Sequence, residues 1–227
     1  MDHNERFIRI EGLTKEFDVG RSFLEKGQKL RAVDNVSLDI KRGETLGLVG
    51  ESGCGKSTFG RCVLRLIEPT EGKVLYENKD LLQFSKDEMR KMRRKLQMVF
   101  QDPFSSLNPA RKIGWIMEEP LKLKGIKDKK QRKEMVDQML VEIGLDPSFA
   151  NRYARELSGG QRQRISIGLS LMRGEKLIIA DEPVSALDVT VQSQILRLLL
   201  KLHDEKNLTY MFISHDLNVV HHMCHRS

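Results

Sequence analysis

Apolar residues along this chain follow two spacings, one typical of strands and one typical of helices. Within residues 36–40 apolar side chains alternate with polar ones, which is the period of a half-buried strand. We therefore expect antiparallel β structure across residues 7–40, interrupted by a polar loop over residues 19–30.

Further along, short continuous apolar runs indicate buried strands. They lie at residues 45–49, 74–76, 177–180 and 208–213, and a further strand is expected at residues 94–100. Apolar residues at helical spacing predict helices at residues 56–67, through most of 110–156, after residue 160, and at 191–202. Strands that alternate with helices favour an α/β fold with a mostly parallel sheet covered on both faces.

Composition narrows the class of protein. The chain has 227 residues, of which 39% are hydrophobic and 31% charged, an ordinary globular balance. No run approaches the roughly 18 apolar residues of a membrane helix, and residues 1–7 lack an apolar secretory core, so we expect a cytosolic protein. Three scattered cysteines do not make a disulfide framework.

A net charge of +7 can indicate a protein that binds nucleic acid. Basic residues cluster at 86–95 and 122–133, but acidic residues are interspersed in both clusters. Solvated helix faces explain this pattern better than a nucleic-acid groove does.

Residues 50–57 spell G-x-x-x-x-G-K-S between a predicted strand and a predicted helix, which is the pattern of a phosphate-binding loop. The candidate binding residues are Gly50, Glu51, Ser52, Gly53, Cys54, Gly55, Lys56, Ser57 and Thr58. The glycines let backbone N–H groups face an anion, Lys56 reaches the β- and γ-phosphates, and Ser57 holds Mg²⁺. A plain glycine turn would not explain Lys-Ser at this offset.

Polar side chains follow three other predicted strands. Asp181 ends an apolar strand, where it is placed to hold Mg²⁺, and Glu182 could polarise a water against the γ-phosphate. A turn or helix-cap role is the alternative for this pair. Gln101 and His215 lie at the ends of their own strands.

A second predicted anion-binding helix start lies at residues 157–161, LSGGQ, with Ser158, Gly159, Gly160 and Gln161 as its candidate contacts. A mononucleotide site needs one such helix start. Two in one chain suggest composite sites, each completed by a second chain.

In this order the motifs resemble the ATP-binding cassette of ABC transporters: GESGCGKST, Gln101, LSGGQ, LIIADE, the dimer loop at residues 185–188, and His215. The resemblance covers nearly the whole chain. It implies an ATPase that binds ATP and Mg²⁺ and pairs head to tail with a second cassette, identical or a sister chain.

The resemblance also implies individual roles. Phe17 would stack on adenine, and Ser158 and Gly160 would close on the γ-phosphate of the opposing subunit. Glu182 would be the catalytic carboxylate and His215 the γ-phosphate switch, while Gln101 would touch Mg²⁺ and sense the membrane partner. Metal contacts would come from Ser57, Gln101 and Asp181.

A P-loop NTPase fold is implied, with an antiparallel β subdomain at 1–44, an ATP-binding core at 45–102 and 160–227, and a helical subdomain at 103–159. The family continues beyond the histidine, so we expect a single domain that is incomplete at its C-terminus. His221, His222, Cys224 and His225 could suggest a metal cluster, but the resemblance places them in the helix after the switch.

Residues 43–58, the stretch FQDPFSSLNPARKIG and AVDNVSLDI are similar to the second ATPase subunit of dipeptide, oligopeptide and nickel importers. This implies permease partners on the cytosolic face of the membrane and, indirectly, an extracytoplasmic solute-binding protein. The alternative is a soluble cassette ATPase of DNA repair or translation, although no coiled-coil insertion or second cassette is visible. A nucleotide-binding module without turnover is a weaker alternative.

Overall fold

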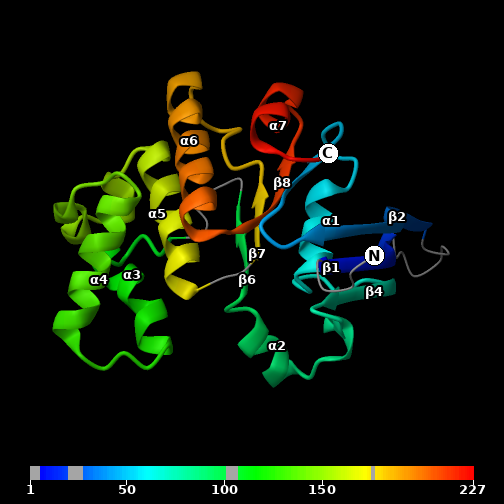
Figure 1. Cartoon of the computed structure of the whole chain (residues 1–227), viewed down its shortest axis with the longest axis horizontal. Coiled ribbons are helices and arrows are strands. Elements are labelled where there is room, and N and C mark those ends of the chain that lie inside the picture. Colours follow the sequence, from blue (N-terminus) through cyan, green and yellow to red (C-terminus); the bar gives the residue numbers. More distant parts are fainter. Residues whose placement is uncertain (1–5, 20–27, 101–106, 175–176) are drawn as a thin grey trace. The chain divides into compact units, whose positions relative to one another are not determined.

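The computed structural model describes residues 6–19, 28–100, 107–174 and 177–227. Within them the chain forms two compact units (Figure 1). The first unit comprises Met1–Arg93 and Thr209–Ser227, and the second comprises Arg94–Leu208. The subdomain boundaries expected from the sequence stay a prediction.

An antiparallel sheet in the order β2-β1-β4-β5 builds much of the first unit. Its strands are β1 (Arg6–Val19), β2 (Gln28–Lys41), β4 (Glu71–Tyr76) and β5 (Lys79–Asp80). Ile8, Ile10 and Leu13 of β1 are at most 1% exposed, so this sheet encloses a core of its own. The antiparallel structure predicted for residues 7–40 is confirmed in its described parts, residues 7–19 and 28–40.

The polar loop predicted at residues 19–30 was partly wrong. Val19 belongs to β1 and Gln28–Leu30 belong to β2, where Val19 pairs with Gln28 and Phe17 with Leu30. These residues are exposed, so they lack the apolar alternation that marks a half-buried strand. Residues 20–27 lie outside the described part of the chain.

A parallel pair in the first unit carries the phosphate-binding loop. Strand β3 (Thr45–Val49) pairs with β8 (Thr209–Ser214) from Thr45↔Tyr210 to Val49↔Ser214. Helix α1 (Lys56–Val63) follows β3, and α7 (Leu217–Met223) follows β8. The remaining elements of this unit are η1 (Leu81–Gln83) and α2 (Lys86–Met92).

Helix α1 ends at Val63, short of the predicted residue 67. Arg65 has a φ of 50°, which a right-handed helix does not permit. Its guanidinium donates to the carbonyl oxygens of Leu81 and Phe84 at 2.9 and 2.6 Å, so these contacts hold the turn.

The second unit joins a second parallel pair to a group of helices. Strand β6 (Leu96–Val99) pairs with β7 (Leu177–Asp181) from Leu96↔Leu177 to Val99↔Ala180. Its helices are α3 (Ile113–Leu123), α4 (Lys129–Glu142), η2 (Pro147–Asn151), η3 (Ala154–Glu156), α5 (Gly159–Arg173) and α6 (Val189–Lys206). Most of α5 is buried, so the other elements of this unit pack around it. Parallel strands with crossover helices confirm the α/β class.

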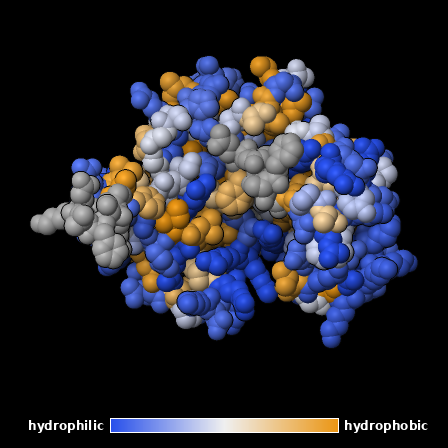
Figure 2. Space-filling model, turned by 180° about the vertical axis from the view of Figure 1, so that it is seen from behind, coloured by the Kyte–Doolittle hydropathy of each residue, from blue (hydrophilic) through white to orange (hydrophobic). Residues whose placement is uncertain are grey.

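Hydrophilic residues cover much of the face shown in Figure 2, and hydrophobic residues gather there in separate groups. Across the described ranges, no helix combines the length and the apolar character needed to cross a membrane.

Candidate functional site

The loop between β3 and α1 is shaped by glycines with positive φ. Gly53 has a φ of 82° and Gly55 a φ of 99°. Glycine adopts such positive φ values readily because it has no Cβ, whereas other residues adopt them only at an energetic cost. A Cβ on Gly55 would lie 2.0 Å from the carbonyl oxygen of Ala32, so the loop rests directly on the backbone of β2. Glycine at 55 is therefore required by contact as well as by conformation.

Lys56 lies across this loop. Its side chain is folded back, and its ammonium donates to the carbonyl oxygens of Gly50 and Glu51 at 2.7 and 2.6 Å. Lys56 is only 8% exposed, which places a cation within the curve of the loop.

The start of α1 suits a phosphate. Gly55 is its N-cap residue, and no side chain caps the helix there. The first N–H groups of a helix lack intrahelical partners and carry the positive end of the helix dipole. With the ammonium of Lys56 and the Ser57 hydroxyl in the first turn, the residues present fit a Mg-nucleotide triphosphate.

Cys54 lies at the same place. It is exposed, and its Sγ is 3.7 Å from the ammonium of Lys56. A Cβ on Gly50 would meet this sulfur at 2.9 Å. Burial raises the pKa of the Cys62 thiol to about 11 and that of Cys224 to about 12, so neither of these provides a reactive thiolate near neutral pH.

His215 emerges next to the loop. Because Val49 pairs with Ser214 in the parallel ladder, the residues that follow them, Gly50 and His215, leave the same strand ends side by side. The first unit therefore brings the predicted histidine to the phosphate-binding loop.

Phe17 belongs to the same unit. The residue is 36% exposed, and the Lys15 ammonium lies 4.9 Å from the centroid of its ring. Its cross-strand partner, Leu30, lies two residues before Ala32, on which the loop rests. The predicted adenine-stacking residue is thus carried by strands that also support the phosphate-binding loop.

The second unit holds the two predicted carboxylates. Asp181 ends β7 and is 3% exposed, while Glu182 is half-buried. Glu182 has a φ of 45°, a strained conformation for a side chain of this kind, and such strain clusters at functional sites. Its carbonyl accepts from the N–H and hydroxyl of Ser185 at 3.3 and 3.1 Å, so the start of the dimer loop fixes the turn.

The signature sequence forms a capping box at the start of α5. The N–H of Gln161 donates to the Ser158 hydroxyl at 3.3 Å, and the N–H of Ser158 donates to Gln161 Oε1 at 3.0 Å. A Cβ on Gly159 would meet Leu187 at 3.1 Å, and one on Gly160 would meet Val191 at 2.4 Å. The signature glycines therefore pack directly on the dimer loop and the start of α6.

Gln192 is a residue that sequence reasoning missed. Its amide donates to the carbonyl oxygens of Val184, just before the dimer loop, and Leu187, within it, at 3.0 and 3.1 Å, so Gln192 holds the loop against α6. Asp188 caps α6, and Gln192 is a polar residue in the first turns of that helix. This position was the available signal that its side chain could reach the loop before the helix.

Other predictions have no structural test. Gln101 lies outside the described residues. The placement of Asp181 and Glu182 against the phosphate-binding loop stays a prediction, because those residues belong to different units. His221 and His222 lie in α7, as the resemblance implied, but the placement of the other two was wrong, because Cys224 is the C-cap residue of α7 and His225 lies beyond it. No cluster of three or more metal-ligating side chains occurs in the described part of the chain.

Comparison with known proteins agrees with these features. Residues 33–185 match the family model described as "ABC transporter". The chain is 49% identical to the oligopeptide transport ATP-binding protein AppF of Bacillus subtilis over 226 residues, which cover 99% of this chain and 69% of that protein. It is 46% identical to the dipeptide transport ATP-binding protein DppF of Haemophilus influenzae, covering 97% of this chain and 67% of that protein.

A third relative, a probable peptide ABC transporter ATP-binding protein of Sinorhizobium fredii, is covered to 64% of its length, so the chain spans about two thirds of these relatives. Among solved structures, the dimeric post-hydrolysis state of the ATP-binding cassette MJ0796 bound to ADP and Pi is similar, with a TM-score of 0.82 and 34% identity. The match covers 93% of this chain and 89% of that one.

Proposed function

The chain belongs to the ABC transporter family as an ATP-hydrolysing cassette, and we propose that it energises the import of peptides. The observation that carries the ATPase part is the start of α1, with its positive-φ glycines, its lack of a side-chain cap, and the Lys56 ammonium within the loop. The names of the oligopeptide and dipeptide transport relatives support the peptide class.

Each predicted side chain has a task in the proposed reaction. Lys56 and the loop N–H groups hold the β- and γ-phosphates, while Ser57, Asp181 and Gln101 hold Mg²⁺, which supplies charge neutralisation when bound. Glu182 orients and polarises the attacking water, and His215 contacts the γ-phosphate. Phe17 stacks on the base.

Ser158 and Gly160 act on a nucleotide held by a second cassette, in a head-to-tail dimer. The capping box supports this role, because a hydroxyl that accepts from Gln161 keeps its own hydrogen to donate. The signature of one chain can therefore hydrogen-bond a phosphate without giving up its cap.

Mixing two inactive variants tests the shared site. A Lys56→Ala chain and a Ser158→Arg chain each lose turnover alone. In a mixed head-to-tail dimer, one site carries both lesions and the other carries none, so activity returns. If the natural partner is a sister subunit, activity returns only when that subunit is added. Full turnover from a strictly monomeric Ser158→Arg chain would refute the mechanism.

The permease docks, we propose, on the helical part of the second unit at the cytoplasmic face of the membrane. A groove of about 390 Å³ lies along α3 and α4 there, with Trp115 in its wall. Lysines at 112, 122, 129 and 133 outnumber its acidic residues, so a segment with acidic side chains suits it.

Lys129→Glu tests this docking site. The residue is exposed and begins α4, where a carboxylate is compatible with the helix dipole. We expect weaker co-purification with the permease and unchanged ATP affinity. If the Lys129→Glu variant and the unmodified chain recover equal amounts of the permease, then the docking site lies elsewhere.

A further inference from the structure

The ribbon that carries Phe17 has little support from the rest of its sheet. In the described pairings β4 follows β1 only from Ile8 to Thr14, whereas β2 follows β1 as far as Val19. Residues 16–19 therefore pair with β2 alone. A two-stranded ribbon is marginally stable by itself, so the position of Phe17 depends on what ties its two strands together.

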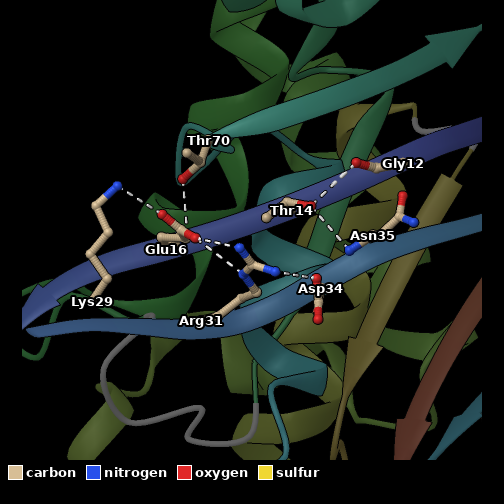
Figure 3. Close-up of polar contacts among 8 residues, drawn as sticks. All are labelled: Gly12, Thr14, Glu16, Lys29, Arg31, Asp34, Asn35 and Thr70. Atoms are coloured by element: carbon tan, nitrogen blue, oxygen red, sulfur yellow. Dashed lines mark hydrogen bonds and ion pairs between the residues drawn. The ribbon is translucent and has the colours of Figure 1, made fainter.

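Side chains replace the regular ladder where this ribbon begins. The register of β1 and β2 shifts on both sides of Lys15. Here the N–H of Asn35 donates to the Thr14 hydroxyl at 3.0 Å, and the N–H of Glu16 donates to the Thr70 hydroxyl at 2.9 Å (Figure 3). The ribbon thus leaves the sheet at a bulge held by specific side chains.

Glu16 is the tie across the ribbon. Its Oε1 accepts from Nε and Nη2 of Arg31 at 3.1 and 2.9 Å, and its Oε2 accepts from Lys29 Nζ at 3.0 Å (Figure 3). Arg31 also donates to Asp34 at 3.0 Å. Only 16% of the Glu16 side chain is exposed, against 53% for Arg31 and 66% for Lys29, so the carboxylate is enclosed by its two partners.

This tie brackets Phe17. Glu16 pairs with Arg31 in the register, and Phe17 pairs with Leu30, which lies between Lys29 and Arg31. The hydrogen bond from Lys29, followed by that from Arg31, lowers the pKa of Glu16, and the pKa values of Lys29 and Arg31 are raised by the same contacts. All three groups are therefore charged at neutral pH.

The same strand segment supports the phosphate-binding loop. Ala32, whose carbonyl oxygen faces Gly55, directly follows Arg31. Fixing Glu16 on Arg31 therefore fixes the position of Phe17 relative to the loop.

We propose that Glu16 is a positioning residue for the nucleotide base, because its ion pairs with Arg31 and Lys29 hold the Phe17 ring at a set position beside the phosphate-binding loop. This inference rests on the proposed function. The proposed role concerns the base and not the phosphates. Loss of Glu16 should therefore weaken the binding of a nucleotide but not of a phosphate chain without a base, whereas loss of a merely stabilising ion pair would not distinguish the two ligands.

The experiment compares Mg-ATP with inorganic Mg-tripolyphosphate, which has no base, by titration calorimetry on the 227-residue chain. Glu16→Gln removes the charge and keeps the shape. We expect ATP affinity to fall about fivefold, as the loss of a cross-strand charge pair allows, with tripolyphosphate affinity unchanged. In a Phe17→Ala background the Glu16→Gln change should have no further effect on ATP affinity.

Glu11→Gln is the matched control. Glu11 lies in the same strand and pairs with Arg9 at 2.9 Å, but outside the ribbon. It should leave ATP affinity unchanged.

Three results overturn the inference alone: unchanged ATP affinity in Glu16→Gln, an equal loss for ATP and tripolyphosphate, or a full Glu16 effect without Phe17. If the unmodified chain binds no ATP, the proposed function fails and this inference fails with it.

Discussion

The starts of α1 and α5 are both marked by the sequence as anion sites, yet they are built in opposite ways. The N-cap residue of helix α1 is Gly55, with a φ of 99° and no side-chain cap, so backbone geometry alone sets its first turn. The N-cap residue of helix α5 is Ser158, whose hydroxyl accepts from Gln161 and whose N–H donates to Gln161.

The difference separates two roles. A helix start without a side-chain cap is suited to a strongly bound ligand, because the ligand can supply the partners that the first N–H groups need. A capped helix start is stable by itself and can add one hydroxyl contact to an anion held elsewhere. We therefore expect α1 to determine nucleotide affinity and α5 to affect turnover.

Lys56→Ala should give the largest effect, a loss of ATP affinity that has no counterpart at the start of α5. It removes the cation that lies over the loop, and charge-assisted hydrogen bonds to two phosphates correspond to about a thousandfold in ATP affinity. Titration with Mg-ATP measures this loss, and Ser158→Ala should show nucleotide affinity within about twofold of the unmodified chain. Near-normal affinity in Lys56→Ala would remove the assignment of the phosphate site.

Glu182→Gln should give the opposite profile. Loss of a positioned base lowers turnover by about a hundredfold or more, while ATP still binds through the first unit. Steady-state hydrolysis and nucleotide titration on the same protein separate the two quantities. Unchanged hydrolysis would mean that another group polarises the water.

Local motifs explain why the phosphate-binding loop could be predicted. Its strand, its glycines and Lys56 lie within a few residues of one another, so the spacing of these residues in the sequence is enough to predict how they lie in the structure. Ser158 and Gln161 were equally readable, although their mutual capping was not anticipated.

Contacts between distant residues could not be predicted in this way. The ribbon of residues 16–19 and 28–31 is held by ion pairs at exposed positions, which leave no hydrophobic period. Gln192 and Val191 matter because of the carbonyls and the glycine that they contact in three dimensions. Ser85 and Glu88 form the capping box of α2. Their spacing is a local signal for the start of a helix, but the hydrophobic pattern does not include it.

Alanine at two glycines of the phosphate-binding loop would sharpen the comparison by a smaller amount. Both have positive φ, but a Cβ on Gly53 meets nothing within 4 Å, whereas one on Gly55 meets the Ala32 carbonyl oxygen. Gly53→Ala should cost about 1 kcal/mol of unfolding free energy, from its conformation. Gly55→Ala should cost about 2 kcal/mol more, from overpacking against backbone. Chemical denaturation measures both, and equal losses would show that the contact between the loop and β2 is absent.

The smallest effect concerns the cap of α5. Ser158→Ala removes the oxygen that accepts from the Gln161 N–H, and loss of such a cap costs about 1 kcal/mol, whereas Ser158→Gly costs a few tenths. Denaturation of the two variants, compared with ATP titration of each, tests whether α5 is stabilised by its own side chains. Because α1 has no side-chain cap to lose, mutation of its first turn should change ligand affinity more than stability, and Ser158 should show the reverse. If Ser158→Ala and Ser158→Gly unfold at the same denaturant concentration as the unmodified chain, then the capping box does not stabilise α5, and the two helix starts do not differ in the way that their geometry implies.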